Sequence, residues 1–184
     1  PILDQKTAPV RKFLVAGDGG FNLTHAEPLE SFVKKYDANY LRDCVSQFSN
    51  TDFRNWLEAI GIPTFVGSSG KVFPVAPIKP IEVLNAWLKV LDSPNIHWKL
   101  KSRLVDFDKK TVTIVKDKQE EVLPYDYLVF ACGGASWKKT GSDGKWKALF
   151  KQKEIPVKEF ESSNSGLELE SNQWLAAHEG SVIK

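Results

Sequence analysis

The sequence predicts an α/β fold, and three observations support this prediction. The first half of the chain carries apolar residues at helical spacing, and from Ile96 onward apolar and polar residues alternate as in β-strands. A short apolar strand at residues 127–130 then runs into the small residues 131–136, which include two glycines. Ligands of open α/β sheets lie outside the carboxyl ends of strands, so we expect residues 131–136 to line a large flat cofactor. A tight turn is the competing interpretation.

Apolar stripes predict the helices. Residues at i, i+3, i+4 and i+7 are apolar in 29–36, 41–48 and 53–60, and helical spacing returns in 81–91. The third helix has a start signal in Ser49-Asn50-Thr51-Asp52 and a stop signal in Gly61. Cys44 lies on the second stripe, so we expect a core residue there rather than a nucleophile. Residues 145–153 are expected to form a further short helix.

The β-strands fall into two groups. Residues 62–65 and 71–73 flank a hairpin-like loop, and residues 96–100, 103–107, 111–115 and 121–123 alternate with turns. A small antiparallel meander before the strand at 127–130 is unusual for a plain Rossmann unit. It suits a nucleotide-binding domain in which a β-meander replaces the crossover helix.

Composition bounds the function classes. The 184 residues are 42% hydrophobic and 26% charged, and the net charge of +2 gives no argument for nucleic acid or a membrane as partner. Two cysteines and three histidines never cluster at metal-ligand spacing, so we expect no metal site. No disulfide framework is possible with so few cysteines, which favours a reducing, cytoplasmic location. No apolar run approaches the length of a membrane span.

The ends of the chain suggest an internal piece of a larger protein. The chain begins with what reads as the end of a strand, Ile2-Leu3-Asp4, and contains no methionine. It stops at Lys184 in what looks like a new strand. We expect a partial nucleotide-binding domain at residues 1–160, and a linker with the beginning of another domain at 161–184.

Glycine-rich loops are the candidate binding elements. Gly17-Asp18-Gly19-Gly20 supplies backbone N–H groups at little steric cost, as loops facing phosphates or flat rings do, although a flexible connection explains it equally well. Asp4 could accept hydrogen bonds from a ribose, but the G-x-G-x-x-G turn that should precede it is absent from this chain. The sequences Trp137-Lys138-Lys139 and Lys145-Trp146-Lys147 could bind single-stranded nucleic acid. Because the net charge is balanced, we favour a different interpretation, in which these residues form a solvated loop and a helix start whose tryptophans point inward.

Five motifs in order resemble one family, the bacterial BaiN-like (also called YhiN-like) flavoproteins, predicted FAD-dependent oxidoreductases. They are the strand ending at Asp4, the segment from Val10 to His25, Phe48-Ser49-Asn50-Thr51-Asp52, Gly70-Lys71-Val72-Phe73-Pro74, and the segment from Ala131 to Gly144. The chain departs from the family pattern at three places. It has Gly20-Phe21 where many members have Arg-Cys, His25 where many have Asn, and Val10 in place of the usual glycine. It therefore resembles the subgroup with Gly-Gly and Thr-His.

The resemblance implies a fold and a cofactor. The fold would be an FAD/NAD(P)-binding Rossmann-like domain of the glutathione-reductase type, with the β-meander crossover. Its first strand and phosphate turn would lie in a missing N-terminal segment, an inserted β domain would begin near residues 165–184, and a C-terminal segment would complete the FAD site. The activity would be hydride or electron transfer between a nicotinamide cofactor, NAD(P)H, and a small-molecule substrate. The alternative is a folded piece with no FAD binding or redox activity of its own.

The resemblance also assigns cofactor contacts to residues of this chain. Asp4 would bind the adenosine ribose, Arg11 and Lys12 the neighbouring phosphate or ribityl region, and Leu104 and Val105 the adenine. The isoalloxazine would be bordered by Gly17, Gly19, Gly20, Asn22, Thr24, Ala131, Cys132, Gly133, Gly134, Ala135, Ser136, Thr140 and Gly141. No side chain stands out as a catalytic acid or base, and His25 and Cys132 are the candidates to test.

Overall fold

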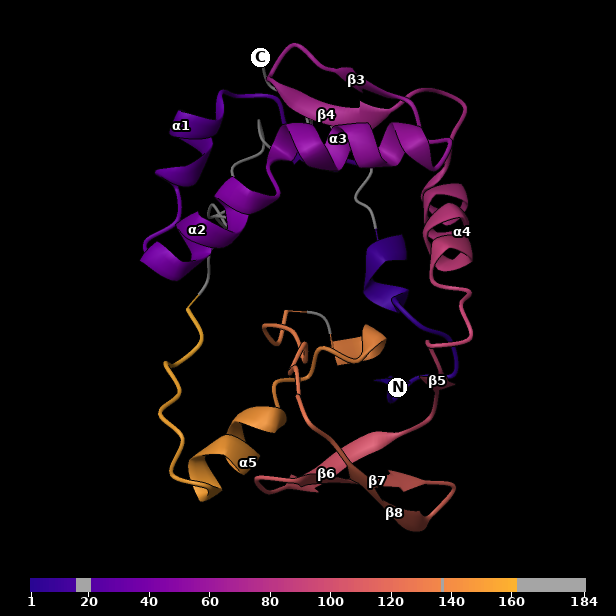
Figure 1. Cartoon of the computed structure of the whole chain (residues 1–184), viewed down its shortest axis with the longest axis vertical. Coiled ribbons are helices and arrows are strands. Elements are labelled where there is room, and N and C mark those ends of the chain that lie inside the picture. Colours follow the sequence, from indigo (N-terminus) through magenta and orange to yellow (C-terminus); the bar gives the residue numbers. More distant parts are fainter. Residues whose placement is uncertain (16–20, 137, 162–184) are drawn as a thin grey trace, which may run out of the picture.

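The structure, a computed structural model, describes residues 1–15, 21–136 and 138–161. Gly17, Gly19, Gly20 and residues 162–184 of the expected linker and second domain (161–184) lie outside these residues. In Figure 1 the helices α1–α4 and the strands β3 and β4 lie at one end of the molecule, and the strands β6–β8 lie at the other. β5 and the N-terminal end of the chain lie between the two ends.

The helices follow the predicted stripes closely. They are α1 (Leu29–Val33), α2 (Asn39–Gln47), α3 (Asn50–Ala59), α4 (Pro80–Val90) and α5 (Trp146–Gln152), with the 3-10 helices η1 (Arg11–Leu14) and η2 (Lys138–Thr140). The predicted start of α3 is confirmed as a capping box. The Ser49 hydroxyl accepts from the Asp52 N–H, and the Asp52 carboxylate accepts from the Ser49 N–H. These bonds satisfy backbone donors that the first helical turn leaves free.

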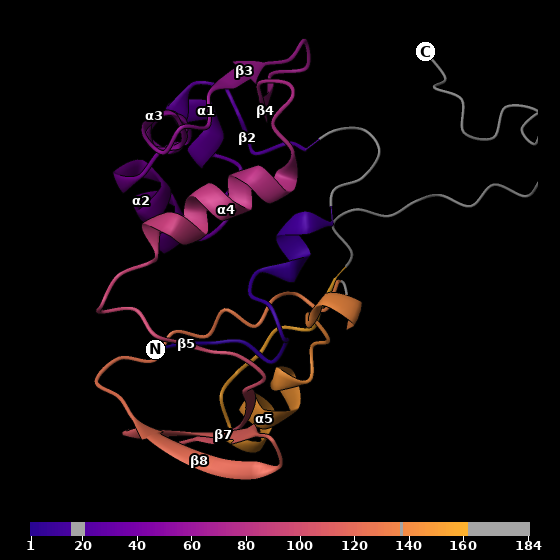
Figure 2. The ribbon, with the colours of Figure 1, turned by 90° about the vertical axis from the view of Figure 1, so that its right-hand side faces the viewer.

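The strands form three small sheets in the described part of the chain. β1 (Ile2–Leu3) pairs in parallel with β5 (Trp98–Lys99), and β2 (Thr24–His25), β4 (Lys71–Pro74) and β3 (Thr64–Val66) form an antiparallel sheet in that order. The predicted meander is confirmed as β6 (Arg103–Phe107), β7 (Thr111–Lys116) and β8 (Gln119–Pro124). Figure 2 shows this meander below α5.

The main hydrophobic core lies under α3 and α4. Leu57, Ile62 and Val83 are buried there. Phe13 of η1 packs edge-on against Trp87 of α4, with 5.7 Å between ring centroids, and so attaches the N-terminal segment to this core. The position of Lys12, next to Phe13, is thereby fixed by packing.

The predicted strand at residues 127–130 is wrong. Residues 127–132 make no backbone–backbone hydrogen bond within the described parts of the chain. The side chains still alternate as in a strand: Tyr127 is 93% exposed and Val129 86%, whereas Leu128 and Phe130 are half-buried. Among the described residues, no strand lies beside this segment to complete its ladder. The period-two pattern is therefore present, but the pairing that defines a strand is not.

Two expectations for the helices also need correction. Cys44 is exposed, not a core residue. The apolar stripe of α2, which also contains Leu41 and Phe48, remains 38% and 54% exposed at those two positions. Helical spacing identifies which side chains share a face, but it does not show that another element covers that face. The first stripe extends to Tyr36, whereas α1 ends at Val33.

Candidate functional site

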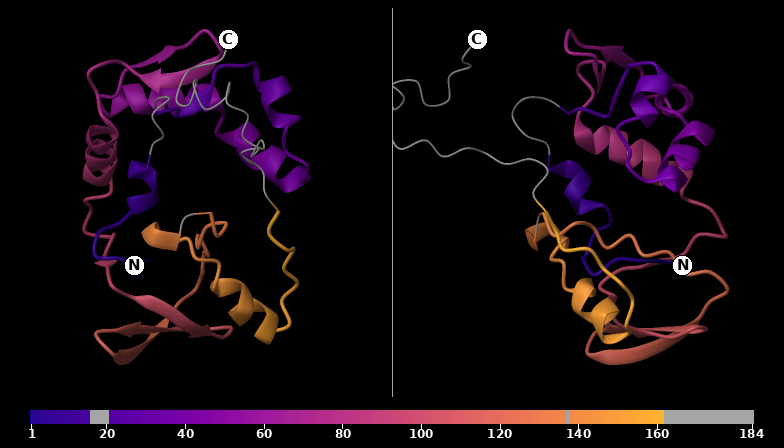
Figure 3. Two further views of the ribbon diagram at one scale, coloured as in Figure 1. Left: turned by 180° about the vertical axis from the view of Figure 1, so that it is seen from behind. Right: turned by 90° about the vertical axis from the view of Figure 1, so that its left-hand side faces the viewer.

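The N-terminal segment and the glycine loop, which we define as residues 131–144, come together in space. The Lys12 ammonium donates a hydrogen bond to the Ser136 hydroxyl at 2.6 Å, and the Gln5 amide donates to the Gly141 carbonyl at 2.6 Å. These partners are 124 and 136 positions apart in the sequence. Figure 3 shows η1 beside the turn of η2 in both of its views. The structure thus gathers two of the segments assigned to the cofactor.

Asp4 lies at the end of β1 with a defined orientation. Its N–H donates to the Lys99 carbonyl, its own carbonyl accepts from Ser102, and its carboxylate accepts from the Lys6 N–H at 2.8 Å. The side chain is half-buried. A carboxylate fixed at the end of a parallel strand can serve as a hydrogen-bond acceptor for a hydroxyl of a bound ligand.

The two central glycines of the loop lack side chains for different reasons. Gly133 has φ +76°, and a β-carbon there would lie 2.5 Å from the Ser142 hydroxyl oxygen, so the protein itself requires glycine. A β-carbon on Gly134 would meet nothing within 4 Å. Of the two glycines, only Gly134 faces open space. Only at Gly134 can the missing side chain therefore make room for a ligand.

Ser142 carries a polar atom without a partner. The residue is 7% exposed, and its hydroxyl oxygen makes no hydrogen bond with any described group. Buried hydroxyls are nearly always satisfied, because leaving one unpaired costs about 1–3 kcal/mol. An unsatisfied hydroxyl directly beside Gly133 indicates that the glycine loop can accommodate a further hydrogen-bonding group.

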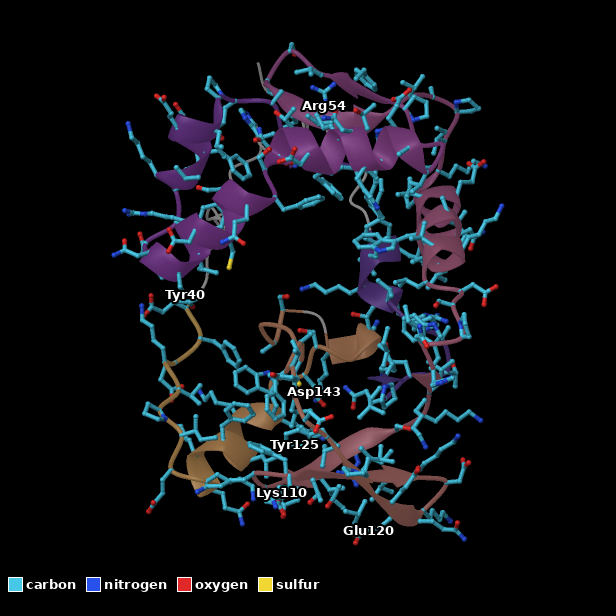
Figure 4. All side chains as sticks on the ribbon, viewed as in Figure 1. Tyr40, Arg54, Lys110, Glu120, Tyr125 and Asp143 are labelled. Atoms are coloured by element: carbon cyan, nitrogen blue, oxygen red, sulfur yellow. The ribbon has the colours of Figure 1, made fainter. Side chains whose placement is uncertain are left out.

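Cys132 is a poor candidate for a nucleophile. Burial raises the pKa of its thiol, and the carboxylate of Asp143 raises it further. The group is therefore a neutral thiol near pH 7, whereas nucleophilic cysteines react as thiolates. Figure 4 labels Asp143 in the half of the molecule that also contains Tyr125 and the β6–β8 meander.

His25 is held by local contacts on β2. Its Nδ1 accepts a hydrogen bond from the Glu27 N–H at 3.2 Å, and its Nε2 lies 3.2 Å from the Ser69 carbonyl oxygen. The ring also packs against Gly70, where a β-carbon would come within 2.8 Å of it. Figures 1 and 2 place the β2–β4–β3 sheet at one end of the molecule and the glycine loop near its middle. The structure does not bring His25 together with residues 131–144.

The residues assigned to the adenine coincide with an irregularity in β6. The register of β6 with β7 shifts between Leu104 and Asp106, so Val105 has no partner opposite it. A β-bulge of this kind interrupts the ladder and re-aims the residue, and bulges are common beside binding sites. The β-strand pairing therefore leaves this position open for a contact outside the sheet.

The remaining assigned residues lie on separate elements. Arg11 is exposed on η1, Asn22 is exposed, and Thr24 pairs with Val72 in the β2–β4 sheet. Ala131 is exposed, and Thr140 closes η2. Our sequence reasoning missed Gln5 and Trp146 as neighbours of the glycine loop, because no local motif reveals a contact across so many positions.

The described residues show no metal site and no membrane-spanning helix, and several of their lysines pair with carboxylates. No group of three or more His, Cys, Asp and Glu side chains is arranged there to hold a metal ion. Lys147 and Lys151 of α5 pair with Glu159, and Lys153, the residue after α5, pairs with Asp106. Within the described ranges, the helices are too short and too polar to span a bilayer.

Comparison with known proteins gives two results. Residues 1–173 match the model of the family described as HI0933-like protein Rossmann domain. Over 150 residues the chain is 27% identical to the 3-dehydro-bile acid delta(4,6)-reductase of Clostridium scindens (strain ATCC 35704 / DSM 5676 / VPI 13733 / 19). This similarity covers 80% of the chain but 36% of the reductase, so the chain spans little more than a third of that relative's length.

Proposed function

Because the chain belongs to the HI0933-like Rossmann-domain family, we propose that it is the FAD-binding part of a longer FAD-dependent oxidoreductase. Family membership confirms the predicted Rossmann-like α/β domain and the resemblance described above. The reductase activity named for the Clostridium scindens relative supports the proposed reaction class. The first strand outside the chain, the inserted domain after residue 160 and the Gly-Gly/Thr-His subgroup stay predictions.

Gly134 is the observation that carries the proposal. It is a glycine without a steric requirement from the protein, and it lies in the loop that the Lys12–Ser136 hydrogen bond ties to the N-terminal segment. A flat ring can approach such a backbone closely. The unsatisfied hydroxyl of Ser142 belongs to the same loop and lies next to Gly133. The residues present therefore fit a large planar cofactor with polar edges.

The chain's own residues would hold the cofactor in distinct ways. Asp4 would accept from ribose hydroxyls, Lys12 would offer positive charge to the phosphate or ribityl region, and the bulged Val105 would offer backbone groups to the adenine. Residues 131–136 would border the ring system. FAD supplies the hydride or electron transfer, and the protein supplies position and electrostatics. We propose NAD(P)H as the electron donor and a small molecule as the substrate.

The exposed segment at 127–130 supports a site completed by other parts of the polypeptide. Tyr127 and Val129 are almost fully exposed, and the backbone beside them is unpaired in the described structure. We propose that a strand outside this chain pairs with it, and that the phosphate-binding turn follows that strand. Lys147 of the basic segment pairs with Glu159, and the net charge of the chain is only +2, so we propose no nucleic-acid role.

The test compares the full-length protein with the 184-residue chain alone. We expect the purified full-length protein to be yellow, with flavin absorbance and about one FAD per polypeptide. The chain alone should retain little or no FAD, because the pyrophosphate would lack its helix-terminus site. A colourless full-length protein that does not bind added FAD would contradict the proposal. Equal retention of FAD by both polypeptides would contradict the need for outside segments.

A further inference from the structure

We propose that Trp146 is a positioning residue for the glycine loop, and that Phe160 supports it from behind. The proposal rests on the FAD site proposed above. Trp146 is the first residue of α5, and its indole N–H donates a hydrogen bond to the Gly133 carbonyl at 3.0 Å. Residues 131–136 make no backbone–backbone hydrogen bond within the described chain, so this side-chain contact is a main constraint on their path.

The loop needs such a constraint because its backbone is strained. Ala135 has φ +62°, a left-handed conformation that alanine rarely adopts. Conformations of this kind persist where surrounding contacts determine them, and they are concentrated at active sites and ligand-binding loops. The indole bond to Gly133 acts two residues before Ala135. This hydrogen bond therefore fixes the path of the backbone just before Ala135.

A second contact supports Ala135 from the other side. A β-carbon on Gly144 would lie 2.8 Å from the Ala135 β-carbon and 3.0 Å from the Phe160 ring. Gly144 is thus enclosed between the two, and the Phe160 ring backs the turn that touches Ala135. Phe160 also packs edge-on against Trp146, with 5.7 Å between ring centroids. Trp146 and Phe160 therefore form one aromatic support behind the glycine loop.

Charged groups hold Phe160 in this place. The Lys147 ammonium lies 5.1 Å from the centre of the Phe160 ring, and Glu159 forms ion pairs with both Lys147 and Lys151. The segment 159–160 is therefore attached to α5. Removing the indole N–H should loosen the loop, while the aromatic packing and the ion pairs keep α5 folded.

The experiment uses the full-length protein with Trp146→Phe, which keeps an aromatic ring against Phe150 and Phe160 but removes the N–H donor. Phe65→Leu is the control, since Phe65 is an exposed aromatic residue that packs against Phe73 in the β2–β4–β3 sheet. The rate of tryptic cleavage after Lys138 and Lys139, which lie in the glycine loop, is measured without flavin. Cleavage should be about 5- to 10-fold faster in Trp146→Phe, as expected for the loss of one hydrogen bond, and unchanged in Phe65→Leu. Phe160→Leu, at a 41% exposed position, should accelerate cleavage by a smaller factor.

Flavin binding provides the second measurement. Trp146→Phe should raise the dissociation constant of FAD and shift the flavin absorbance maximum, whereas Phe65→Leu should leave both unchanged. Loop cleavage at the wild-type rate in both Trp146→Phe and Phe160→Leu would overturn the positioning role. Faster loop cleavage with unchanged FAD binding would confirm that role, and would instead contradict the placement of the flavin at this loop.

Discussion

Alanine substitutions at the two central glycines of the loop should have opposite effects on stability. In Gly133→Ala the new β-carbon is forced into a left-handed backbone, which costs about 1–2 kcal/mol, and it lies 2.5 Å from the Ser142 hydroxyl. Overpacking of a filled site adds about 1 kcal/mol or more. Gly134 has neither constraint. Alanine there should raise the free energy of unfolding by about 0.4–1 kcal/mol, because it reduces the conformational entropy of the unfolded chain. The two variants should therefore differ by about 3 kcal/mol.

Urea unfolding of the flavin-free full-length protein measures this difference. Ser142→Ala provides a control, because it removes the oxygen that the Gly133→Ala methyl meets. The double variant Gly133→Ala/Ser142→Ala should recover about 1 kcal/mol of the loss, which a double-mutant cycle detects. Equal destabilisation by Gly133→Ala and Gly134→Ala would show that both glycines pack against the protein. The reasoning that Gly134 faces open space would then be refuted.

Four further perturbations test individual features. Val10→Gly should stabilise by up to about 1 kcal/mol in urea unfolding, because Val10 has φ 56° at the position where the resembled family has glycine. Leu57→Ala should destabilise by about 2–5 kcal/mol, since Leu57 is fully buried. Peptide mapping after thiol labelling at pH 7 should find Cys44 modified well before Cys132, because Cys44 is exposed and burial raises the pKa of Cys132. Hydrogen bonds from Lys147 and Lys151 lower the pKa of Glu159 from 4.5 to about 2, so its stabilising contribution is present above pH 4.5 and is lost as the pH falls towards 2. Glu159→Gln should flatten the fall in stability over that window, and an unchanged pH dependence would contradict the ion pairs.

The helices and the meander could be predicted from the sequence, because they are determined by residues that lie close together in the chain. The start of α3 depends on Ser49 and Asp52, three positions apart, and the strands β6–β8 are joined by short turns. The pairing of residues 127–130 depends on a neighbouring strand, and the covering of Cys44 depends on another element. Neither dependence is visible in the segment itself.

The candidate site was predictable as a set of segments but not as a geometry. The glycine motifs indicated which loop to examine, and Asp4 and Lys12 were assigned by resemblance. The distinction between Gly133 and Gly134 depends on Ser142, and the support of the loop depends on Trp146. These contacts join parts of the chain whose spacing has no periodic signature, so they follow only from the folded structure.

The dissociation constant of FAD from full-length Gly134→Leu tests the central claim most directly. Leucine at the open position should leave the unfolding temperature of the flavin-free protein near that of wild type, because nothing lies within 4 Å of the new β-carbon. Ser68→Leu, at an exposed position in the β3–β4 turn, serves as the control. We predict at least about tenfold weaker FAD binding in Gly134→Leu alone, equivalent to about 1.4 kcal/mol. FAD binding as tight as in wild type would contradict a flavin lying against this loop.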